Sequence, residues 1–258
     1  MILDEIAAKT KERVAECKSA VALDELKAKA AYTDLKKDYA FEKALQGGGL
    51  SFITEVKKAS PSKGVIAEDF PYLQIAKDYE AAGADCISCL TEPYWFKGSD
   101  DYLRDIKKNV SIPVLRKDFT VDEYMIYEAA LMGADCILLI CAILSDMQLS
   151  EYYGLARELG LSVLTECHDE KEIEMALRIN ASVIGVNNRN LKDFTVDINN
   201  SIRLRDMVPR DKVFVSESGM KTAEDIARLR DNGVDAVLIG ETLMRAADKK
   251  AMIDSLRN

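Results

Sequence analysis

Short apolar runs recur along the chain, and most are preceded by turn residues and followed by a segment with the spacing of an amphipathic helix. This pattern is typical of parallel strands that are buried on both faces and alternate with helices. It predicts strands at residues 51–56, 85–90, 113–116, 136–140, 162–165, 183–186, 213–216 and 236–239. Between them it predicts helices, among others at residues 72–82, 122–132, 146–159, 169–179 and 222–232, each with a capping residue or an acidic first turn.

A short internal repeat marks the passage from helix to strand. Gly83, Gly133 and Gly233 are each followed by Ala or Val, then by Asp, and then by a predicted strand. Glycine commonly ends helices, so the repeating unit is a helix, a glycine cap and a strand. Eight strands that alternate with helices fit a closed (β/α)8 TIM barrel better than an open, doubly wound sheet.

The first 46 residues do not follow this rhythm. They predict two helices, at residues 2–17 and 23–46, which end before three consecutive glycines at 47–49. We interpret residues 1–46 as an N-terminal helical extension that caps the barrel of residues 47–258, within one domain overall. Packing is the favoured role for this extension, with direct ligand contact as the alternative.

Composition and charge narrow the function. The 258 residues are 48% hydrophobic and 31% charged, as in one globular α/β domain. A formal net charge of -9 argues against a nucleic-acid partner. The N-terminus mixes charged and apolar residues, unlike a signal peptide, and the longest apolar run, residues 136–144, is too short for a bilayer. We expect a cytoplasmic protein with no membrane partner, and a monomer because no exposed apolar stripe stands out.

The cysteines and the single histidine limit the chemistry further. The six cysteines are scattered, at positions 17, 86, 89, 136, 141 and 167, which favours reduced core thiols over a metal site. His168 is the one histidine and follows a predicted strand, where we expect it to cap a helix or to be exposed. Lysine, glutamate and aspartate are therefore the main candidates for proton transfer.

Charged and polar residues gather where the predicted strands end. The active sites of such barrels lie at the C-terminal ends of the strands. Five strands end in residues that do not suit an apolar interior, in the segments EVK at 55–57, RKD at 116–118, TE at 165–166, NNR at 187–189 and ESG at 217–219. Each could form a surface ion pair, but together they predict one charged mouth whose groups shift each other's pKa.

Glycines after the last two strands indicate an anion site. Gly219 and Gly240 follow strands and precede helices, where backbone amides can bind a phosphate group. Such turns also occur for steric reasons alone. The loop of residues 60–64, SPSKG, is either a lid with an anion-seeking lysine or an ordinary solvated turn, and its closeness to Lys57 favours the lid.

Four segments in this order resemble the indole-3-glycerol phosphate synthase family: EVKKASPSKG at 55–64, LRKDF at 115–119, GVNNRNL at 185–191 and SESG at 216–219. The resemblance extends from the N-terminal extension to the last helix. It implies a decarboxylating ring closure in tryptophan biosynthesis, from 1-(2-carboxyphenylamino)-1-deoxyribulose 5-phosphate to indole-3-glycerol phosphate, CO2 and water. It implies no cofactor and no metal, because an iminium formed from the substrate's own nitrogen can accept the electrons released on decarboxylation.

The resemblance also implies roles for individual residues. Lys117 would be the general acid of ring closure, with Lys57 as a second acid or charge stabiliser. Glu166 and Glu55 would handle protons in the dehydration. The remaining residues would orient the substrate's carboxylate and hydroxyl groups, namely Asn187, Arg189 and Ser60. Two neighbouring ammonium groups lower each other's pKa, so the sequence does not decide which lysine is the acid.

Binding residues follow from the same resemblance. The phosphate would bind at Ser218, Gly219, Gly240 and the amide of Glu241, with Lys57 or Lys63 adding charge. The Glu241 carboxylate would repel a phosphate, so we expect it to point away. The anthranilate ring would lie in an apolar slot formed by Phe96, Phe119, Leu138 and Leu191.

Two alternatives compete with this interpretation. One is another phosphate-binding barrel of the same pathway, such as phosphoribosylanthranilate isomerase or the tryptophan synthase α subunit, which shares the phosphate half but lacks the set of Glu55, Lys57 and Lys117. The other is a non-catalytic barrel that serves as a binding protein. Such a protein would be expected to lose its charged strand ends, which are present here.

Overall fold

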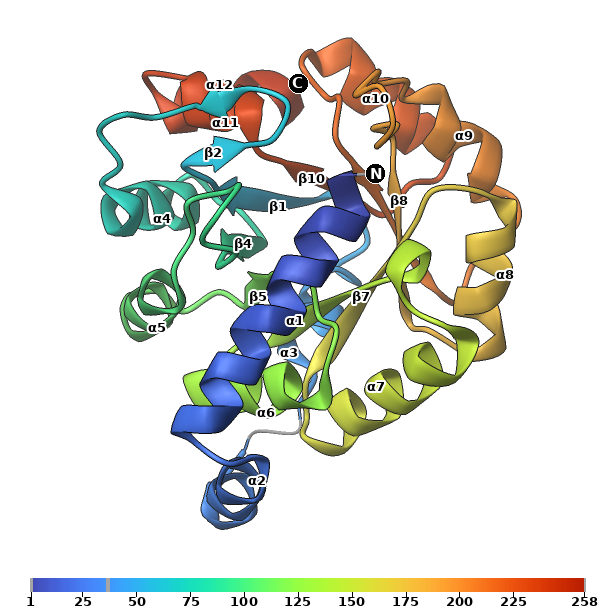
Figure 1. Ribbon diagram of the computed structural model, residues 1–258. Helices are drawn as coiled ribbons and strands as arrows, with labels where there is room; N and C mark the ends of the chain where they lie inside the picture. Colours follow the sequence, from blue (N-terminus) through green and yellow to red (C-terminus); the bar gives the residue numbers. More distant parts are fainter. Residues whose placement is uncertain (1, 36–37, 258) are drawn as a thin grey trace.

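The computed structural model describes residues 2–35 and 38–257, and its strands close into a barrel surrounded by helices (Figure 1). Eight parallel strands of the described chain pair in the order β1-β10-β9-β8-β7-β6-β5-β4, and β4 closes the ring against β1. Their bounds are β1 Ser51–Val56, β4 Cys86–Leu90, β5 Val114–Lys117, β6 Cys136–Ile140, β7 Ser162–Cys167, β8 Val183–Asn187, β9 Val213–Glu217 and β10 Ala236–Ile239. The predicted (β/α)8 TIM barrel is confirmed, with strand ends shifted by at most two residues.

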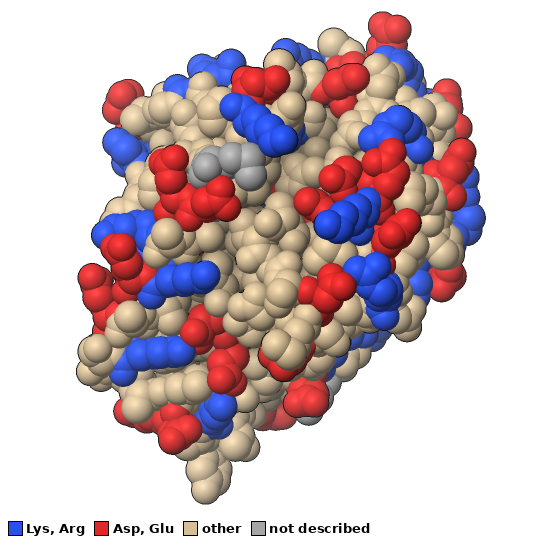
Figure 2. Space-filling model, turned by 45° about the vertical axis from the view of Figure 1, so that its right-hand side comes forward, with Lys and Arg blue, Asp and Glu red and all other residues tan. Residues whose placement is uncertain are grey.

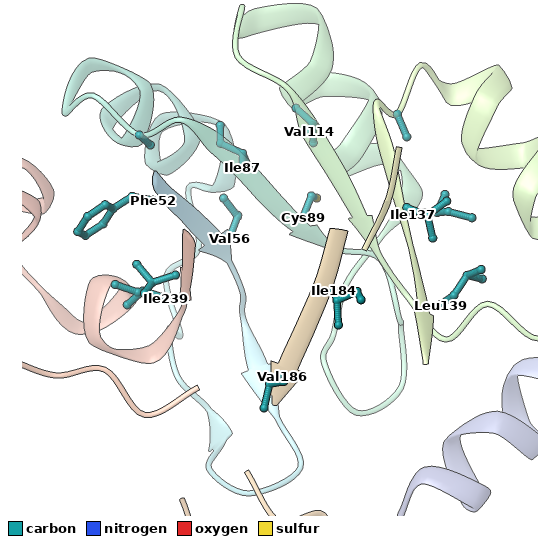
Figure 3. Close-up of a cluster of buried hydrophobic side chains, with 14 of the residues drawn as sticks. Phe52, Val56, Ile87, Cys89, Val114, Ile137, Leu139, Ile184, Val186 and Ile239 are labelled. Carbon is teal, nitrogen blue, oxygen red and sulfur yellow. The ribbon is translucent and has the colours of Figure 1, made fainter. Parts of the chain in front are cut away.

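Side chains alternate between the two faces of each strand. One set packs outward against the helices, and Figure 3 shows Phe52, Ile137 and Leu139 pointing away from their strands on this outer side. The other set fills the barrel, with Ile53, Leu115 and others in an inner apolar cluster. Because both faces are buried, strands such as β1 and β6 are buried at every position, as their apolar sequences require.

The barrel helices begin at polar caps that can be recognised in the sequence. Asp122, Asp169 and Thr222 each accept a hydrogen bond from a backbone N–H in the first turn of the helix that follows them. The helices around the barrel are α4 Tyr72–Ala81, α5 Asp100–Asn109, α6 Glu123–Met132, α7 Asp146–Glu158, α8 Glu170–Arg178, α9 Asn199–Arg205, α10 Ala223–Asp231, α11 Glu241–Arg245 and α12 Lys249–Arg257. A 3-10 turn, η1 Cys141–Ile143, follows β6.

The repeated Gly-x-Asp segments join each helix to the next strand in two ways. The repeat glycines have left-handed backbones, with φ of 83°, 83° and 75°, a conformation that glycine adopts without strain. The aspartates Asp85, Asp135 and Asp235 accept hydrogen bonds of 2.7–2.8 Å from backbone N–H groups at the start of a neighbouring strand. The repeat therefore ties the N-terminal ends of adjacent strands together.

The N-terminal segment forms three helices rather than the two that were expected. These are α1 Ile2–Ala20, α2 Leu23–Tyr32 and α3 Ala40–Ala44. The predicted helix at 23–46 was wrong, because the chain leaves helical geometry at Thr33 and Tyr39 is left-handed, with φ of 50°. The break has a tertiary cause, since it lets Phe41 turn into the barrel interior, where it is fully buried.

Helices α1 and α3 cover opposite ends of the barrel. Phe41 and Leu45 of α3 pack in the inner cluster with Cys86, Cys136 and Val183, which begin their strands. Figure 1 shows α1 crossing the barrel on the side of the strands' C-terminal ends, and its residues Leu3 and Ile6 join the same inner cluster. Helix α3 thus fills the interior from the N-terminal ends of the strands, and α1 from their C-terminal ends.

The loop after β1 folds into a hairpin. Strand β2 Ala59–Ser60 pairs antiparallel with β3 Gly64–Val65. Of the six cysteines, Cys17 is partly exposed and the other five are buried, all as free thiols. None of the helices in the described part of the chain combines the length and apolar character needed to cross a membrane.

Candidate active site

A pocket of about 760 Å³ opens at the C-terminal ends of the strands. All the site residues selected from the sequence line it. They are Glu55, Lys57, Ser60, Lys63, Phe96, Lys117, Phe119, Leu138, Glu166, Asn187, Arg189, Leu191, Ser218, Gly219, Gly240 and Glu241. The structure therefore brings together residues from β1, β5, β6, β7 and β8 and from the loops that follow the strands.

The ammonium group of Lys117 lies at the centre of the charged part of the pocket. Its Nζ donates to Glu217 Oε2 at 2.6 Å and to Glu166 Oε2 at 3.1 Å, and its side chain is 13% exposed. Burial alone would lower the pKa of Lys117, but the charges of Glu217 and Glu166 outweigh it, so this pKa lies above its ordinary value. The expected lowering of this pKa by a second lysine is not found, because carboxylates surround the group.

Glu217 is a site residue that the sequence analysis did not select. It ends β9 and points inward like Val213 and Val215 before it, so alternation along the strand was the available signal. Burial raises the pKa of Glu217 to about 7; the charge of Glu166 adds to this rise and that of Lys117 opposes it. Its second oxygen, Oε1, has no hydrogen-bond partner among the described residues.

Gly185 makes room for this carboxylate. A Cβ at position 185 on the neighbouring strand β8 would overlap the Glu217 carboxylate and lie 3.0 Å from the Leu164 side chain. Glycine in the inner row of β8 is therefore required by the packing of Glu217, which explains its place in an otherwise apolar strand.

Glu166 ends up ionised although it is fully buried. Its Oε2 accepts from Lys117, and its Oε1 accepts from Asn187 Nδ2 at 3.3 Å. Burial would raise the pKa of Glu166, but the charges of Lys117 and His168 outweigh it and hold the pKa below its ordinary value. An ionised carboxylate that lines the pocket can accept a proton from a bound molecule.

His168 is not placed as the sequence suggested. Its side chain is mostly buried, and Asp169, not His168, caps α8. The ring Nε2 lies 3.5 Å from Glu166 Oε1, and Nδ1 lies 3.0 Å from Glu172 Oε2. The expectation of a capping or exposed histidine was wrong, because the ring is turned toward the carboxylates of Glu166 and Glu172 and is mostly buried there.

Lys57 and Glu55 form a second charged pair. Both extend from the end of β1 on the same side, and Lys57 Nζ donates to Glu55 Oε2. Gly240 lies beside them after β10, where a Cβ would overlap the Glu55 carboxylate and lie 2.7 Å from Lys57 Nζ. This close approach leaves backbone, rather than a side chain, facing the pocket at position 240.

The turns after β9 and β10 expose backbone to one part of the pocket, and cationic side chains lie around it. Ser218 and Gly219 are both left-handed, with φ of 67° and 101°, so the chain turns sharply after Glu217. Glu241 is turned toward Arg245, whose Nε donates to its Oε1 at 3.0 Å. Further cationic side chains line the same pocket, which the sequence analysis did not select: Lys221, Arg228 and Arg245.

Two more predicted residues lie on loops around the mouth. Ser60 and Lys63 belong to the hairpin of β2 and β3, and both line the pocket. Arg189 donates to the carbonyl oxygen of Phe194 at 3.3 Å, and its own backbone N–H donates to Asn187 Oδ1 at 3.1 Å. These bonds hold the loop after β8 against the pocket.

The apolar part of the pocket has buried supports. The rings of Phe96 and Phe119 lie 6.0 Å apart between centroids. The loop that carries Phe96 is held by Glu92, a fully buried carboxylate that accepts backbone N–H groups of residues 94, 95 and 96 at 2.8–2.9 Å. Such bonds satisfy a buried charge and fix the aromatic side chain in place.

Helix α1 contributes both wall and anchor. Ile2, Leu3 and Ile6 line the pocket, so the extension does more than pack against the barrel. Arg13 donates to both oxygens of Asp118, at 2.8 and 2.9 Å, directly beside Lys117. Burial would raise the pKa of Asp118, but Arg13 and Arg116 outweigh it and hold the pKa below its ordinary value.

The face of the molecule drawn in Figure 2 carries mixed charge. Figure 2 shows lysine and arginine side chains interspersed with aspartate and glutamate over the face in view. Such mixing agrees with the net charge of -9 and differs from the continuous basic stripe of a nucleic-acid-binding surface.

Comparisons with known proteins point in one direction. A family model described as indole-3-glycerol phosphate synthase matches residues 3–256. Three similar proteins bear that name: one from Ruminiclostridium cellulolyticum, 61% identical over 100% of this chain and 99% of its own, one from Leuconostoc mesenteroides, 52% identical over 100% and 99%, and one from Endomicrobium trichonymphae, 52% identical over 100% of both.

Proposed function

The chain belongs to the indole-3-glycerol phosphate synthase family, and from this we propose how its pocket divides the work of the reaction. The protein is a carboxy-lyase of tryptophan biosynthesis. It converts 1-(2-carboxyphenylamino)-1-deoxyribulose 5-phosphate to indole-3-glycerol phosphate with loss of CO2 and water. The alternatives of another barrel enzyme of the pathway and of a non-catalytic barrel receive no support from the family match.

Lys117 is the general acid of ring closure. In this step the aromatic carbon that bears the carboxylate attacks the ribulose carbonyl, whose oxygen becomes an alkoxide and needs a proton. The observation that carries this assignment is the position of Lys117 Nζ, held between Glu217 and Glu166 inside the pocket. The raised pKa keeps the ammonium protonated at neutral pH, and an alkoxide is basic enough to take its proton.

Decarboxylation follows without any electron sink from the protein. The bond between the ring carbon and the carboxylate breaks, and its electrons neutralise the iminium formed at the substrate nitrogen. The apolar slot of Phe96, Phe119, Leu138 and Leu191 holds the anthranilate ring, and an apolar surrounding favours release of neutral CO2 from a carboxylate. These residues therefore act by position and exclusion of water.

Dehydration completes the indole ring. The hydroxyl group at the new ring carbon leaves as water after it gains a proton, and the neighbouring methylene carbon loses one. Glu166, whose pKa is lowered so that it is ionised, accepts the methylene proton with Glu55 nearby. Lys57 stabilises charge or supplies the second proton from its contact with Glu55. Asn187, Arg189 and Ser60 orient the substrate's carboxylate and hydroxyl groups.

The phosphate group of the substrate binds at the turns after β9 and β10. Ser218, Gly219, Gly240 and the amide of Glu241 supply hydrogen-bond donors there, and Lys57 or Lys63 adds charge. The contact of Glu241 with Arg245 turns the carboxylate away from this part of the pocket and offsets its charge. This supports phosphate binding at a position where a bare carboxylate would repel the ligand.

We further infer that the protein works as a cytoplasmic monomer. Residues 1–46 and the barrel of residues 47–258 act as one domain, because α1 and α3 fill the two ends of the barrel. Large hydrophobic side chains that are exposed in the described chain are Tyr32, Tyr94, Met147 and Val196, and they are too few to suggest a stable apolar interface.

The function is tested with the purified chain and the carboxyphenylamino substrate. Formation of indole-3-glycerol phosphate is followed by the increase in indole fluorescence. Lys117→Ala and Glu166→Gln serve as comparisons, and Glu12→Gln, at an exposed position of α1, serves as a matched control. A lack of fluorescence increase with the unmutated protein would overturn the assignment.

Removal of Lys117 tests its role. We expect Lys117→Ala to reduce kcat by on the order of a hundredfold or more, the usual scale for a lost general acid, with KM largely unchanged. Steady-state kinetics at pH 7 measures both. A variant with normal kcat and strongly raised KM would make Lys117 a binding residue instead.

A further inference from the structure

The reaction consumes one proton in each turnover. Two protons go to the former carbonyl oxygen, which leaves as water, and one returns when the ring methylene carbon is deprotonated. The carboxylate of the substrate leaves as neutral CO2, so charge balances only if one proton enters from solvent. Lys117 and Glu217 line the pocket with side chains 13% and 2% exposed, so a substrate that fills the pocket separates them from solvent and a second route for this proton is needed.

A row of titratable groups leads from the pocket toward the surface. Glu217 contacts Lys117, and Lys117 contacts Glu166, with distances of 2.6 and 3.1 Å. Glu166 Oε1 then faces His168 Nε2 at 3.5 Å, and His168 Nδ1 lies 3.0 Å from Glu172 Oε2. His168, which follows β7, and Glu172, which is on α8, have the most exposed side chains of this row, at 18% and 15%, so the row reaches solvent at this end.

His168 Nε2 is buried and has no hydrogen-bond partner within the described residues. An unsatisfied buried nitrogen is rare in proteins and calls for an explanation. Here it is aimed at Glu166 Oε1 from slightly beyond hydrogen-bond distance, which a small side-chain rotation would close. An imidazole can take up a proton at one ring nitrogen and release one from the other, which a carboxamide cannot do.

The charges around the ring favour its protonated form. Glu166 on β7, Glu172 on α8 and Glu217 on β9 all act on it, while α9 contributes the neutral amide of Asn200, which donates to the His168 carbonyl oxygen. Burial would lower the pKa of His168, but the hydrogen bond with Glu172 and the charge of Glu166 outweigh it, so the pKa is raised. The ring can therefore hold a proton near neutral pH.

We propose that His168 is a positioning and proton-relay residue, which passes the proton consumed in each turnover from Glu172 at the surface to Glu166 and on to Lys117. The relay rests on the assignment of Lys117 and Glu166 as the proton-transfer pair. In each cycle a solvent proton adds to Glu172, one moves to His168 Nδ1, one leaves from Nε2 to Glu166 Oε1, and Lys117 is recharged. No electron transfer or co-reactant is involved.

The test uses rapid mixing of the full chain with excess substrate and indole fluorescence. His168→Gln keeps a donor near the position of Nε2 but cannot titrate. In this variant we expect a first turnover close to the unmutated rate, of about one product per site, because the pocket already holds protons. The steady-state rate that follows should fall on the order of tenfold or more, with KM little changed, because Lys117 regains its proton slowly without the relay.

Added imidazole separates a relay from a structural role. We expect it to restore the steady-state rate of His168→Gln in proportion to its protonated form and to leave the unmutated protein unaffected. Glu172→Gln should show the same burst and slow phase, and it carries the test if His168→Gln does not fold. Glu174→Gln, a charge removed from an exposed position of the same helix, is the matched control and should behave as the unmutated protein.

Two results would overturn the relay. One is a steady-state rate of His168→Gln equal to that of the unmutated protein. The other is a slow first turnover that imidazole does not accelerate, which would make His168 purely structural. Failure of the proposed function is recognised separately, because the unmutated protein would then give no indole fluorescence or Lys117→Ala would retain full turnover.

Discussion

At the scale of single residues, the state of the pocket depends on how three mostly buried groups share protons. Lys117 holds its proton, Glu166 has a lowered pKa, and Glu217 has a pKa of about 7. Glu217 is thus the group whose charge changes in the range where the enzyme works. Below pH 7 it is mostly neutral, and above pH 7 it adds a negative charge to the pocket.

Substitution of Glu217 is expected to change both catalysis and its pH dependence. In Glu217→Gln, Lys117 loses its nearest carboxylate, and kcat should fall on the order of tenfold to a hundredfold because the ammonium is less well held. In the unmutated protein KM should rise as the pH increases through about 7, since an ionised Glu217 repels the anionic substrate.

Steady-state kinetics between pH 6 and 8 measures this, with Glu224→Gln, at an exposed position, as the matched control. The substrate phosphate also titrates in this range, so the comparison is between the two KM profiles. The rise should flatten in Glu217→Gln; equal profiles for both proteins would show that Glu217 does not titrate near pH 7.

The sequence predicted which side chains face the pocket better than it predicted their partners. Alternation along β1 placed Glu55 and Lys57 on one side and the pattern placed residues 116–118 at a strand end, whereas the choice of Lys117 among these came from the family resemblance. Glu217 was placed at a strand end but given no role, and His168 was assigned to the wrong surroundings, because the partner of a strand-end side chain depends on the register of distant strands. The pairing of Lys117 with Glu217 joins residues 100 positions apart, which local patterns do not encode.

At the scale of elements, prediction succeeded where burial and capping act locally. Runs buried on both faces placed β1, β6 and β10 to the residue, and capping residues placed the starts of α6, α8 and α10. It failed in residues 23–46, where helix-forming residues continue but Phe41 has to enter the barrel. The gain from burying an aromatic ring there exceeds the small cost of breaking a surface helix.

The anchor of helix α1 can be tested at this scale. Arg13→Ala removes two hydrogen bonds from Asp118, which keeps the Thr91 hydroxyl at 2.7 Å and the amide of Phe119. We expect the free energy of unfolding at pH 7 to fall by roughly 2 kcal/mol, the scale of a lost charged hydrogen bond. Urea denaturation measures it, with Lys11→Ala on the exposed side of α1 as the control.

The same variant has a defined pH dependence. The lowered pKa of Asp118 stabilises the fold above its ordinary value of 3.8, and this contribution is lost as the pH falls through the lower folded value. Without Arg13, Asp118 takes up a proton at a higher pH. The protonated side chain is neutral, so the loss of the Arg13 charge then costs little. The difference between the two proteins should therefore shrink as the pH is lowered from 7; a constant difference would show that the lost packing of α1, and not charge, is responsible.

At the scale of the whole molecule, the barrel separates stability from chemistry along its axis. The charged pocket occupies the C-terminal ends of the strands, and the N-terminal ends are tied by the repeat aspartates and filled by α3. In barrels of this kind the first end carries function and the second carries stability. The same short N-terminal segment serves both, because α1 lines the pocket and α3 closes the opposite end.

Phe41 allows this separation to be measured. Phe41→Ala leaves a cavity in the inner cluster at the N-terminal ends of the strands, so we expect the free energy of unfolding to fall by about 4 kcal/mol, within the usual range for a buried aromatic residue. Urea denaturation should show a lower midpoint with an unchanged slope, since the folded state stays compact. Tyr32→Ala, at a side chain that is 93% exposed, is the matched control and should unfold as the unmutated protein does.

The kinetics of the same variant decide whether the two ends are independent. Phe41 packs in the inner cluster with residues that begin their strands, whereas Lys117, Glu166 and Glu217 lie at or next to the ends of theirs. The inner apolar layer of Leu115, Leu164 and Val215 precedes these three residues on the same strands. If that layer is rigid, as close packing requires, the cavity below it does not move the charged groups above it. We therefore expect kcat and KM of Phe41→Ala to equal those of the unmutated protein at a temperature where both are folded. If kcat fell along with the free energy of unfolding, the layer would transmit the displacement caused by the cavity. The geometry around Lys117 would then depend on the packing of α3.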